Sequence, residues 1–257
     1  RLVAVMDALS GTVRYGYDAE GNRTVVTDTL GCVTRYGYDL LGRTVVITDP
    51  LGHVTRYGYD ANGNQISVTN ALSGTTRYGY DALDRMIWER DPLGHTTHYG
   101  YDEVGNRTVI TDAEGNVTRY GYDGVSNLIS VTDAISGTTL YGYDEADNRT
   151  VITYANGTTS HFYYNLLNQL KMEVDALDRT WRYSYDDAGH LIREVDGEWQ
   201  ATYYQYDGAG QLTSTFYGIN GGEERVDFEY DAAGNQIAMH DRLGTLTTAY
   251  DALNRPV

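Results

Sequence analysis

Residues 34–56 read TRYGYDLLGRTVVITDPLGHVTR, and this segment contains the whole pattern from which the chain is built. Residues 34–38 alternate and are rich in β-formers, so they predict a strand. Residues 39–43 supply turn chemistry, because an Asp carboxylate can accept backbone N–H groups and a Gly tolerates positive φ. Residues 44–48 predict a second, β-branched strand, and residues 49–52 a second turn with Pro at the position whose φ it fixes. One unit therefore contains two short strands and two tight turns.

The unit recurs along the whole chain. The first aromatic residue of Tyr-Gly-Tyr-Asp returns at constant steps of 21 residues from Tyr15 to Tyr204, and two looser copies follow around Phe228 and Thr248. Such a repeat explains why the chain has 25 Tyr beside only 3 Phe. A sheet of about two dozen strands curls, splits or closes, because sheets of more than roughly 10 strands do not stay open and flat. We therefore predict an all-β fold, in which tandem 21-residue repeats of two short strands form an antiparallel meander that spirals into a hollow β-shell or tube wall.

Two tyrosines and one aspartate of each regular copy are the residues that we expect to carry this structure. Strand alternation places both tyrosines on one face, where stacked copies would form two ladders with each ring packed on the next. The central Gly would leave room for a neighbouring side chain or permit local curvature. The structural residues of the regular repeats are Tyr15, Tyr17, Asp18, Tyr36, Tyr38, Asp39, Tyr57, Tyr59, Asp60, Tyr78, Tyr80, Asp81, Tyr99, Tyr101, Asp102, Tyr120, Tyr122, Asp123, Tyr141, Tyr143 and Asp144.

The repeats are not uniform. Copies are near-identical up to about residue 160, whereas from Phe162 onward Tyr-Gly-Tyr-Asp becomes Phe-Tyr-Tyr-Asn, then Tyr-Ser-Tyr-Asp at Tyr183 and Tyr-Gln-Tyr-Asp at Tyr204. We expect a single repeat array over residues 1–257, with regular repeats in 1–160 and divergent repeats in 161–257 that form a cap or a junction. Because the chain begins and ends within a repeat, we also expect it to be a fragment of a longer chain.

Charge and composition narrow the choice of partners. The formal net charge is −17, which argues against nucleic acid or anionic lipid as the main partner, because both require a basic surface. A cationic partner or divalent ions remain open. The single cysteine, Cys32, excludes an intramolecular disulfide, and no apolar run approaches the roughly 20 residues needed for membrane insertion.

The aspartate column allows two interpretations. The aligned carboxylates could form a ladder that binds Ca²⁺, or each Asp could cap its own turn. Calcium needs several oxygens converging on one ion, and the Gly-Gly-x-Gly-x-Asp pattern of calcium β-rolls is missing. Because Asn165 replaces the Asp in one copy, turn capping is favoured and no metal site is predicted.

The remaining polar residues predict structure rather than catalysis. Arginines precede the first tyrosine in many copies, and we expect them to stack on ring faces or to pair with nearby Asp. The six histidines have no metal-ligand spacing, and no nucleophile, phosphate-loop or dinucleotide motif lies in a suitable context. We therefore predict no enzyme activity, no catalytic residues and no cofactor. The arginines of this column are Arg14, Arg35, Arg56, Arg77, Arg119 and Arg182.

Tyr-x-Tyr-Asp-x-x-Gly-Asn/Arg, followed by a β-branched strand and by Asp-Pro-Leu-Gly at residues 49–52 and 91–94, resembles the YD repeat, also called the RHS repeat. That family includes bacterial Rhs polymorphic toxins, wall-associated proteins, cocoon subunits of insecticidal toxin complexes, and teneurins. The resemblance implies a β-sheet strip that spirals into a large hollow shell, which in the toxins encloses a cytotoxic segment. The plug region with an autoproteolytic aspartate site, found in the family's toxins, has no match in this sequence.

These observations predict a non-catalytic structural scaffold. It would form the wall of a hollow shell or tube in a large secreted or cell-surface RHS/YD-repeat protein of bacterial origin, serving toxin encapsulation or an extracellular filament. Expected partners are other repeats of the same protein or identical chains, with an enclosed polypeptide cargo as an open possibility, and neither nucleic acid nor a membrane. The alternative is a cell-surface adhesin that binds another cell or a glycan through exposed aromatics such as Trp88, Trp181 and Trp199.

Overall fold

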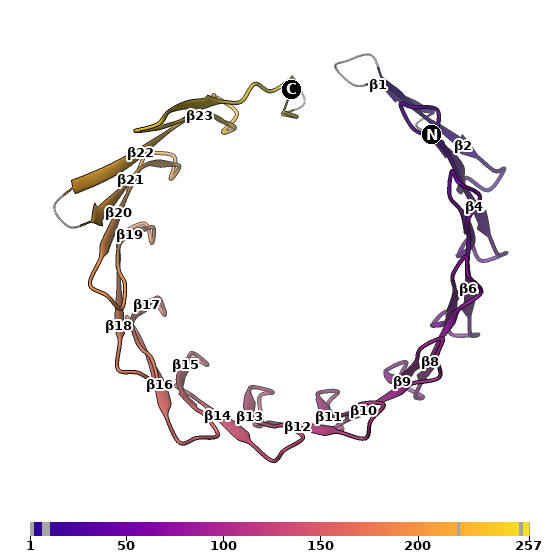
Figure 1. Cartoon of the computed structure of the whole chain (residues 1–257), viewed down its shortest axis with the longest axis horizontal. Coiled ribbons are helices and arrows are strands. Elements are labelled where there is room, and N and C mark those ends of the chain that lie inside the picture. The colour runs from indigo at the N-terminus through magenta and orange to yellow at the C-terminus, as the bar shows by residue number, and fades with distance from the viewer. Residues whose placement is uncertain (1–2, 7–10, 220–221, 252–253, 257) are drawn as a thin grey trace. The chain divides into compact units, whose positions relative to one another are not determined.

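The computed structural model describes residues 3–6, 11–219, 222–251 and 254–256. Within them the regular secondary structure consists of 24 strands in one antiparallel sheet, with strands paired in chain order, and contains no helix (Figure 1). The predicted all-β antiparallel meander of about two dozen strands is thereby confirmed. The chain divides into two compact units, Arg1–Tyr120 and Gly121–Val257, and each is described by itself.

The strands are five or six residues long in most of the chain, as the sequence pattern predicts. The first unit contains β1 (Ala4–Met6), β2 (Thr12–Tyr17), β3 (Arg23–Thr27), β4 (Val33–Tyr38), β5 (Thr44–Thr48), β6 (Val54–Tyr59), β7 (Gln65–Thr69), β8 (Thr75–Tyr80), β9 (Met86–Arg90), β10 (Thr96–Tyr101), β11 (Arg107–Thr111) and the larger part of β12 (Val117–Tyr122). The second unit contains β13 (Leu128–Thr132), β14 (Thr138–Tyr143), β15 (Arg149–Thr153), β16 (Thr159–Tyr164), β17 (Leu170–Val174), β18 (Thr180–Tyr185), β19 (Leu191–Val195), β20 (Ala201–Tyr206), β21 (Leu212–Ile219), β22 (Gly222–Tyr230), β23 (Gln236–Asp241) and β24 (Gly244–Thr247).

The strand that follows the first turn carries a β-bulge opposite the second tyrosine. In β4 and β5, Gly37 pairs with Val46 but Tyr38 pairs with Thr44, so Val45 has no partner residue. The same register shift lies between the central residue and the second tyrosine in β2, β6, β8, β10 and β14. A bulge increases local twist and reorients the side chain beside it. The extra residue lies in the strand that follows the turn, so the second tyrosine keeps the alternation of its own strand and lies opposite two residues of the next one.

Directly paired residues share one face of an antiparallel sheet, so the register defines two faces. The tyrosine face carries Tyr36, Tyr38 and Ile47, and the arginine face carries Arg35 and Gly37 with their partners Thr48 and Val46. Pairing along β2 to β11 repeats this division at every step of the first unit.

The central glycines make room for side chains of the next strand, which was one of the two alternatives that the sequence left open. A Cβ on Gly37 would lie 3.5 Å from Val46 Cβ, an ordinary contact, and one on Gly58 would lie 2.5 Å from Ser67 Oγ. At Gly79 a Cβ would collide with the indole of Trp88, which lies across the bare backbone. The glycine is thus required most strongly where its partner is largest.

The sheet is a single layer with almost no enclosed core. Among the described residues, Val195 and Ala238 are the buried apolar side chains, at 4% and 6% exposure. The accessible surface is 16622 Å², whereas a compact protein of this mass exposes about 11,000 Å². Contacts between neighbouring repeats therefore provide most of the stabilisation.

The step of 24 residues before Phe228 has a local structural cause. β21 and β22 have eight and nine residues instead of five and six, so the extra residues lengthen one hairpin. Tyr206 still pairs with Leu212, and Tyr230 with Gln236, so the bulged register continues on either side.

Candidate functional site

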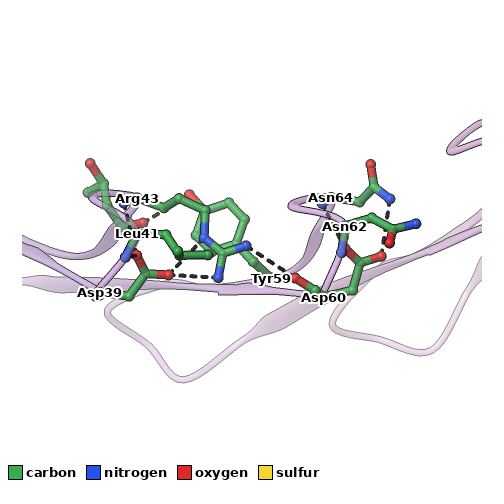
Figure 2. A network of polar contacts seen from close by, with 8 residues as sticks. Asp39, Leu41, Arg43, Tyr59, Asp60, Asn62 and Asn64 are labelled. Carbon is green, nitrogen blue, oxygen red and sulfur yellow. Dashed lines mark hydrogen bonds and ion pairs between the residues drawn. The ribbon is translucent and has the colours of Figure 1, made fainter.

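The first turn of each repeat is organised by its aspartate. The Gly42 N–H donates to Asp39 O, the Asp39 N–H donates to Arg43 O, and Gly42 has a φ of 75°. One carboxylate oxygen, Oδ1, accepts the N–H groups of Leu41 and Arg43 at 2.9 and 3.0 Å, while Oδ2 accepts Arg43 Nε at 2.7 Å (Figure 2). The carboxylate therefore caps its own turn, as the sequence favoured.

The same arrangement recurs with different partners at the last turn position. Asp60 is bound by Asn64, Asp49 by His53, and Asp81 by Arg85, each through the side chain four residues later. In the exceptional copy, Asn165 Oδ1 accepts the same two backbone N–H groups, from Leu167 and Gln169. The sequence contains this Asp-x-x-x-Arg/Asn/His spacing, but our sequence analysis did not use it and considered the histidines only as possible metal ligands.

These hydrogen bonds lower the pKa values of the turn carboxyl groups. The side-chain hydrogen bond from Arg85 is the main cause that lowers the pKa of Asp81, and that from Asn116 lowers the pKa of Asp112. For Asp123 the backbone N–H of Asn127 is the leading cause of the lowered pKa. The carboxylates are thus held ionised by donors within their own turns.

Arg43 also connects one repeat to the next. Its Nη1 donates to the backbone oxygen of Asp60 at 3.1 Å, and its guanidinium lies over the Tyr59 ring at 4.7 Å from the centroid (Figure 2). Arg85 makes the equivalent pair of contacts with Asp102 O, at 2.9 Å, and with the Tyr101 ring, at 4.8 Å.

The second tyrosine of each repeat makes a bond back to the preceding repeat. Tyr59 Oη donates to the backbone oxygen of Thr44 at 2.9 Å, across 15 residues of chain. Partial burial raises the pKa of this kind of hydroxyl, as at Tyr80 and Tyr185, so it stays a donor. The donors of this set are Tyr38, Tyr59, Tyr80, Tyr101, Tyr143, Tyr164, Tyr185, Tyr206 and Tyr230.

The first tyrosines do not stack ring on ring where an arginine follows the turn, and there the expected ladder is wrong. The Arg23 guanidinium lies 5.6 Å from the ring centroids of both Tyr15 and Tyr36. Arg149 bridges Tyr141 and Phe162 in the same way. Alternate strands are about 10 Å apart, too far for direct ring contact, so a side chain of the intervening strand fills the gap.

The arginine column that precedes the first tyrosine also differs from expectation. The guanidinium groups of Arg23, Arg43 and Arg85, at or just after the end of the first turn, lie over tyrosine rings. In contrast, Arg35, Arg56 and Arg77 are exposed on the opposite face of the sheet. The reason is strand alternation, because a residue adjacent to a tyrosine in a strand points to the other face. Among the contacts of the described residues, Arg182 is the member of this column that lies over a ring, that of Trp199, with its guanidinium 4.9 Å from the ring centroid.

The divergent repeats keep the turns but change what fills the gaps between them. His190 stands where other repeats have an arginine such as Arg43, and it stacks on Tyr206, with ring centroids 4.7 Å apart. Partial burial, with the nearby Glu194 carboxylate, raises the pKa of Tyr204 to about 12. Of the three tryptophans, Trp199 is 69% exposed, while Trp88 and Trp181 are half-buried.

The described residues contain no group of three His, Cys, Asp or Glu side chains that could hold a metal ion. No helix in the described part of the chain is long and apolar enough to span a membrane. The larger hollows are open recesses between successive turns, for example between the turns that begin at Asp18 and Asp39. What the repeating geometry does is position one repeat on the next.

A single-layer antiparallel array of 21-residue units, each joined to its neighbour through a Tyr-x-Tyr-Asp motif, defines a β-repeat scaffold. The teneurin YD-shell family matches residues 108–255, and the RHS repeat family matches residues 1–35, 38–75, 59–87 and 88–117. The chain belongs to the YD/RHS repeat family. A search of the curated proteins finds no match to the chain.

Solved structures share the fold at low sequence identity. The structure titled TcdB2-TccC3-TEV aligns with a TM-score of 0.61 and 16% identity, covering 100% of this chain and 19% of that one. A Tc holotoxin pore from Photorhabdus luminescens aligns with a TM-score of 0.58 and 16% identity, covering 96% of this chain and 16% of that one. The chain thus spans about a fifth of the length of the first of these proteins.

Proposed function

We propose that this chain is a segment of the wall of a hollow shell or tube, built from YD repeats in a large secreted or cell-surface protein. The wall has no catalytic role. It either encloses a cargo or forms an extended filament. Its repeats form one array, in which residues 1–160 make regular wall and residues 161–257 a cap or junction. The family membership and the fold shared with Tc toxin proteins support this proposal.

The observation that carries it is a row of apolar side chains along one rim of the sheet. The third residue of the second turn is a leucine in successive repeats of the first unit, and these side chains are 82–91% exposed. A leucine that is exposed at the same position in successive repeats is suited to contact with another surface. In a wall, that contact is the next layer of repeats, from the same protein or from an identical chain. The row consists of Leu30, Leu51, Leu72 and Leu93.

The partners and location follow from this role. The wall packs against other repeats, and in the toxin arrangement it surrounds a polypeptide cargo. The protein then acts outside the cell or on its surface, and a bacterial source fits the likeness to a Photorhabdus luminescens toxin complex.

Electron cryo-microscopy of the native, full-length assembly tests the proposal. Closed particles with internal density are expected for a cargo shell, and continuous tubes with a fixed axial repeat for a filament. In both, the leucine rim should be covered by another row of repeats. A strip whose leucine rim stays open to solvent in the native assembly would contradict the wall.

A paired substitution separates assembly from folding. Leu51→Ser with Leu72→Ser should leave the thermal midpoint of the 257-residue chain unchanged, because both side chains are already exposed. In the full-length protein the same change should destabilise or open the particles. Unaltered full-length particles would show that the rim is not an interface.

A further inference from the structure

The arginine face of the first unit carries positive charge and has no acidic residue at its strand positions. Its strand positions between Arg14 and Arg119 are connected by direct pairing and hold Gly, Ser, Thr, Val, Trp, His and Arg. None of these described positions is Asp or Glu, although the chain has a net charge of −17. The carboxylates of this unit lie at the turns or, like Glu89, on the tyrosine face.

The arginines on this face are unpaired. Arg35, Arg56, Arg77 and Arg119 are exposed and form no ion pair or hydrogen bond with the described residues, in contrast to Arg43 and Arg85. They recur at every second strand, and therefore about 10 Å apart except where His98 interrupts the row. A regular row of unpaired guanidinium groups is suited to an anionic chain rather than to a single small ion.

One point on the row is exceptional. Arg90 lies directly opposite Arg77, where the other repeats have Thr48, Thr69 and Thr111. Like charges directly opposite each other are destabilising, and no carboxylate on this face compensates them. Both arginines border an open, polar hollow of about 450 Å³ at the second turn. Asp91 also lines this hollow, but its carboxylate is bound within its own turn by the backbone N–H groups of Leu93 and His95 and by the His95 ring.

An aromatic ring lies beside this arginine pair. Trp88 is two residues from Arg90 on the same face, pairs with Gly79 and His98, and has its indole lying across the Gly79 backbone. The ring is half-buried, so its other side is turned away from the sheet. Trp88 and Arg90 both replace the short residues, Val or Ser and Thr, that stand at these positions in neighbouring repeats.

We propose that this face of the first unit binds an anionic polysaccharide, whose uronate or sulfate groups are held by the arginine row and one of whose sugar rings rests on Trp88. Paired arginines bind carboxylate or sulfate bidentately, and a flat indole offers apolar surface to a sugar ring. A nucleic acid duplex fits less well, because the phosphates of each strand follow each other every ~3.4 Å along the helix axis, far more closely than the arginines. The inference goes beyond the proposed function and does not depend on it.

The test measures binding of a fluorescently labelled oligogalacturonate to the 257-residue chain by anisotropy, at low and at high salt. Arg77→Gln with Arg90→Thr should weaken binding at least about tenfold at low salt and reduce its salt dependence. Trp88→Val should weaken binding without changing the salt dependence. Thr and Val are residues that this repeat uses at positions 90 and 88 elsewhere, so circular dichroism should show an unchanged fold.

Arg225→Gln with Arg242→Gln is the matched control, because it also removes two positive charges, from exposed arginines of the second unit. The proposal is overturned if the oligogalacturonate does not bind at low salt, or if the control weakens it as much as the double variant. The proposal is also overturned if poly-glutamate or single-stranded DNA binds more tightly than the oligogalacturonate and Trp88→Val does not weaken that binding. The face would then bind a different class of anion.

Discussion

The second tyrosine of each repeat combines an aromatic body with a hydroxyl whose partner lies in the preceding repeat. Tyr59 donates to Thr44 O. Its ring also supports the guanidinium of Arg43 (Figure 2). Phenylalanine could provide the ring but not the hydrogen bond, which accounts for the use of tyrosine at this position. The first tyrosine of the same strand, Tyr57, has no such bond.

That difference gives a prediction within one strand. Tyr59→Phe should lower the free energy of unfolding by about 1 kcal/mol, because a carbonyl loses its donor. Tyr57→Phe is the control and should change it by less than about 0.5 kcal/mol. Urea denaturation followed by circular dichroism measures both. Equal urea midpoints for the two variants would show that the Tyr59 hydroxyl does not stabilise the contact between repeats.

At the scale of the strand, the central glycine and the side chain opposite it behave as a pair. Gly79→Ala should destabilise the chain by about 1–3 kcal/mol, because the new methyl group meets the Trp88 indole. Gly37→Ala should have little effect, because the new methyl group would lie at an ordinary contact distance from Val46.

The double variant makes the strand prediction specific. Gly79→Ala combined with Trp88→Val recreates the pairing of a methyl group with a valine, and should recover most of the lost stability in thermal denaturation. Lack of recovery would mean that backbone freedom, rather than space for the indole, requires the glycine.

The turns give the sheet a defined response to acid. The pKa values of Asp81, Asp112 and Asp123 are lowered in the folded chain, chiefly by hydrogen bonds from the residue four positions later. Their stabilisation is therefore complete above the unfolded pKa of about 3.9 and is lost as the pH falls through the lower folded value. The thermal midpoint should fall progressively below about pH 4.

Asp81→Asn is the control for this acid response. As Asn165 shows, an amide keeps both backbone acceptor bonds, so the variant should fold and should lose less stability on acidification. A thermal midpoint that rises as the pH falls below about 4 would contradict the assigned direction of these pKa shifts.

At the scale of the whole molecule, the 21-residue repeat is the unit that can be removed without disrupting the sheet. Deleting residues 44–64 removes β5, β6 and both turns, and joins Arg43 to Gln65 in the register of an intact repeat. This variant should retain the β-sheet spectrum of the parent and lose little stability, because each repeat contacts only its neighbours.

Deleting residues 44–53 provides the contrast, because it removes one strand and one turn. Two tyrosine-bearing strands would then follow each other, without the intervening strand that supplies the bulge and the acceptor of the tyrosine hydroxyl. We expect this variant to unfold or aggregate. Equal stability of the two deletions would show that the strand, not the 21-residue repeat, is the structural unit.

The sequence predicted the strands, the turns and the family because their signals are local: alternation, Asp and Gly at fixed turn positions, and a constant period. It did not predict the bulge beside Tyr38, which reassigns Thr44 as its partner. Without the register, the sequence could not show which side chains lie between the tyrosine rings. It therefore predicted ring contacts for Arg35, whereas the structure places Arg23 there. Cross-strand contacts depend on pairing, which periodicity alone does not specify.

The bonds of each repeat have a consequence for how the chain is made. Tyr59 finds its acceptor only 15 residues back, and strands pair with their neighbours in chain order. A repeat can therefore close on its predecessor as soon as it leaves the ribosome, without waiting for distant sequence, because local contacts form fast. Synthesis and folding then advance together from the N-terminus, and the freshly made end presents one unpaired strand at a time.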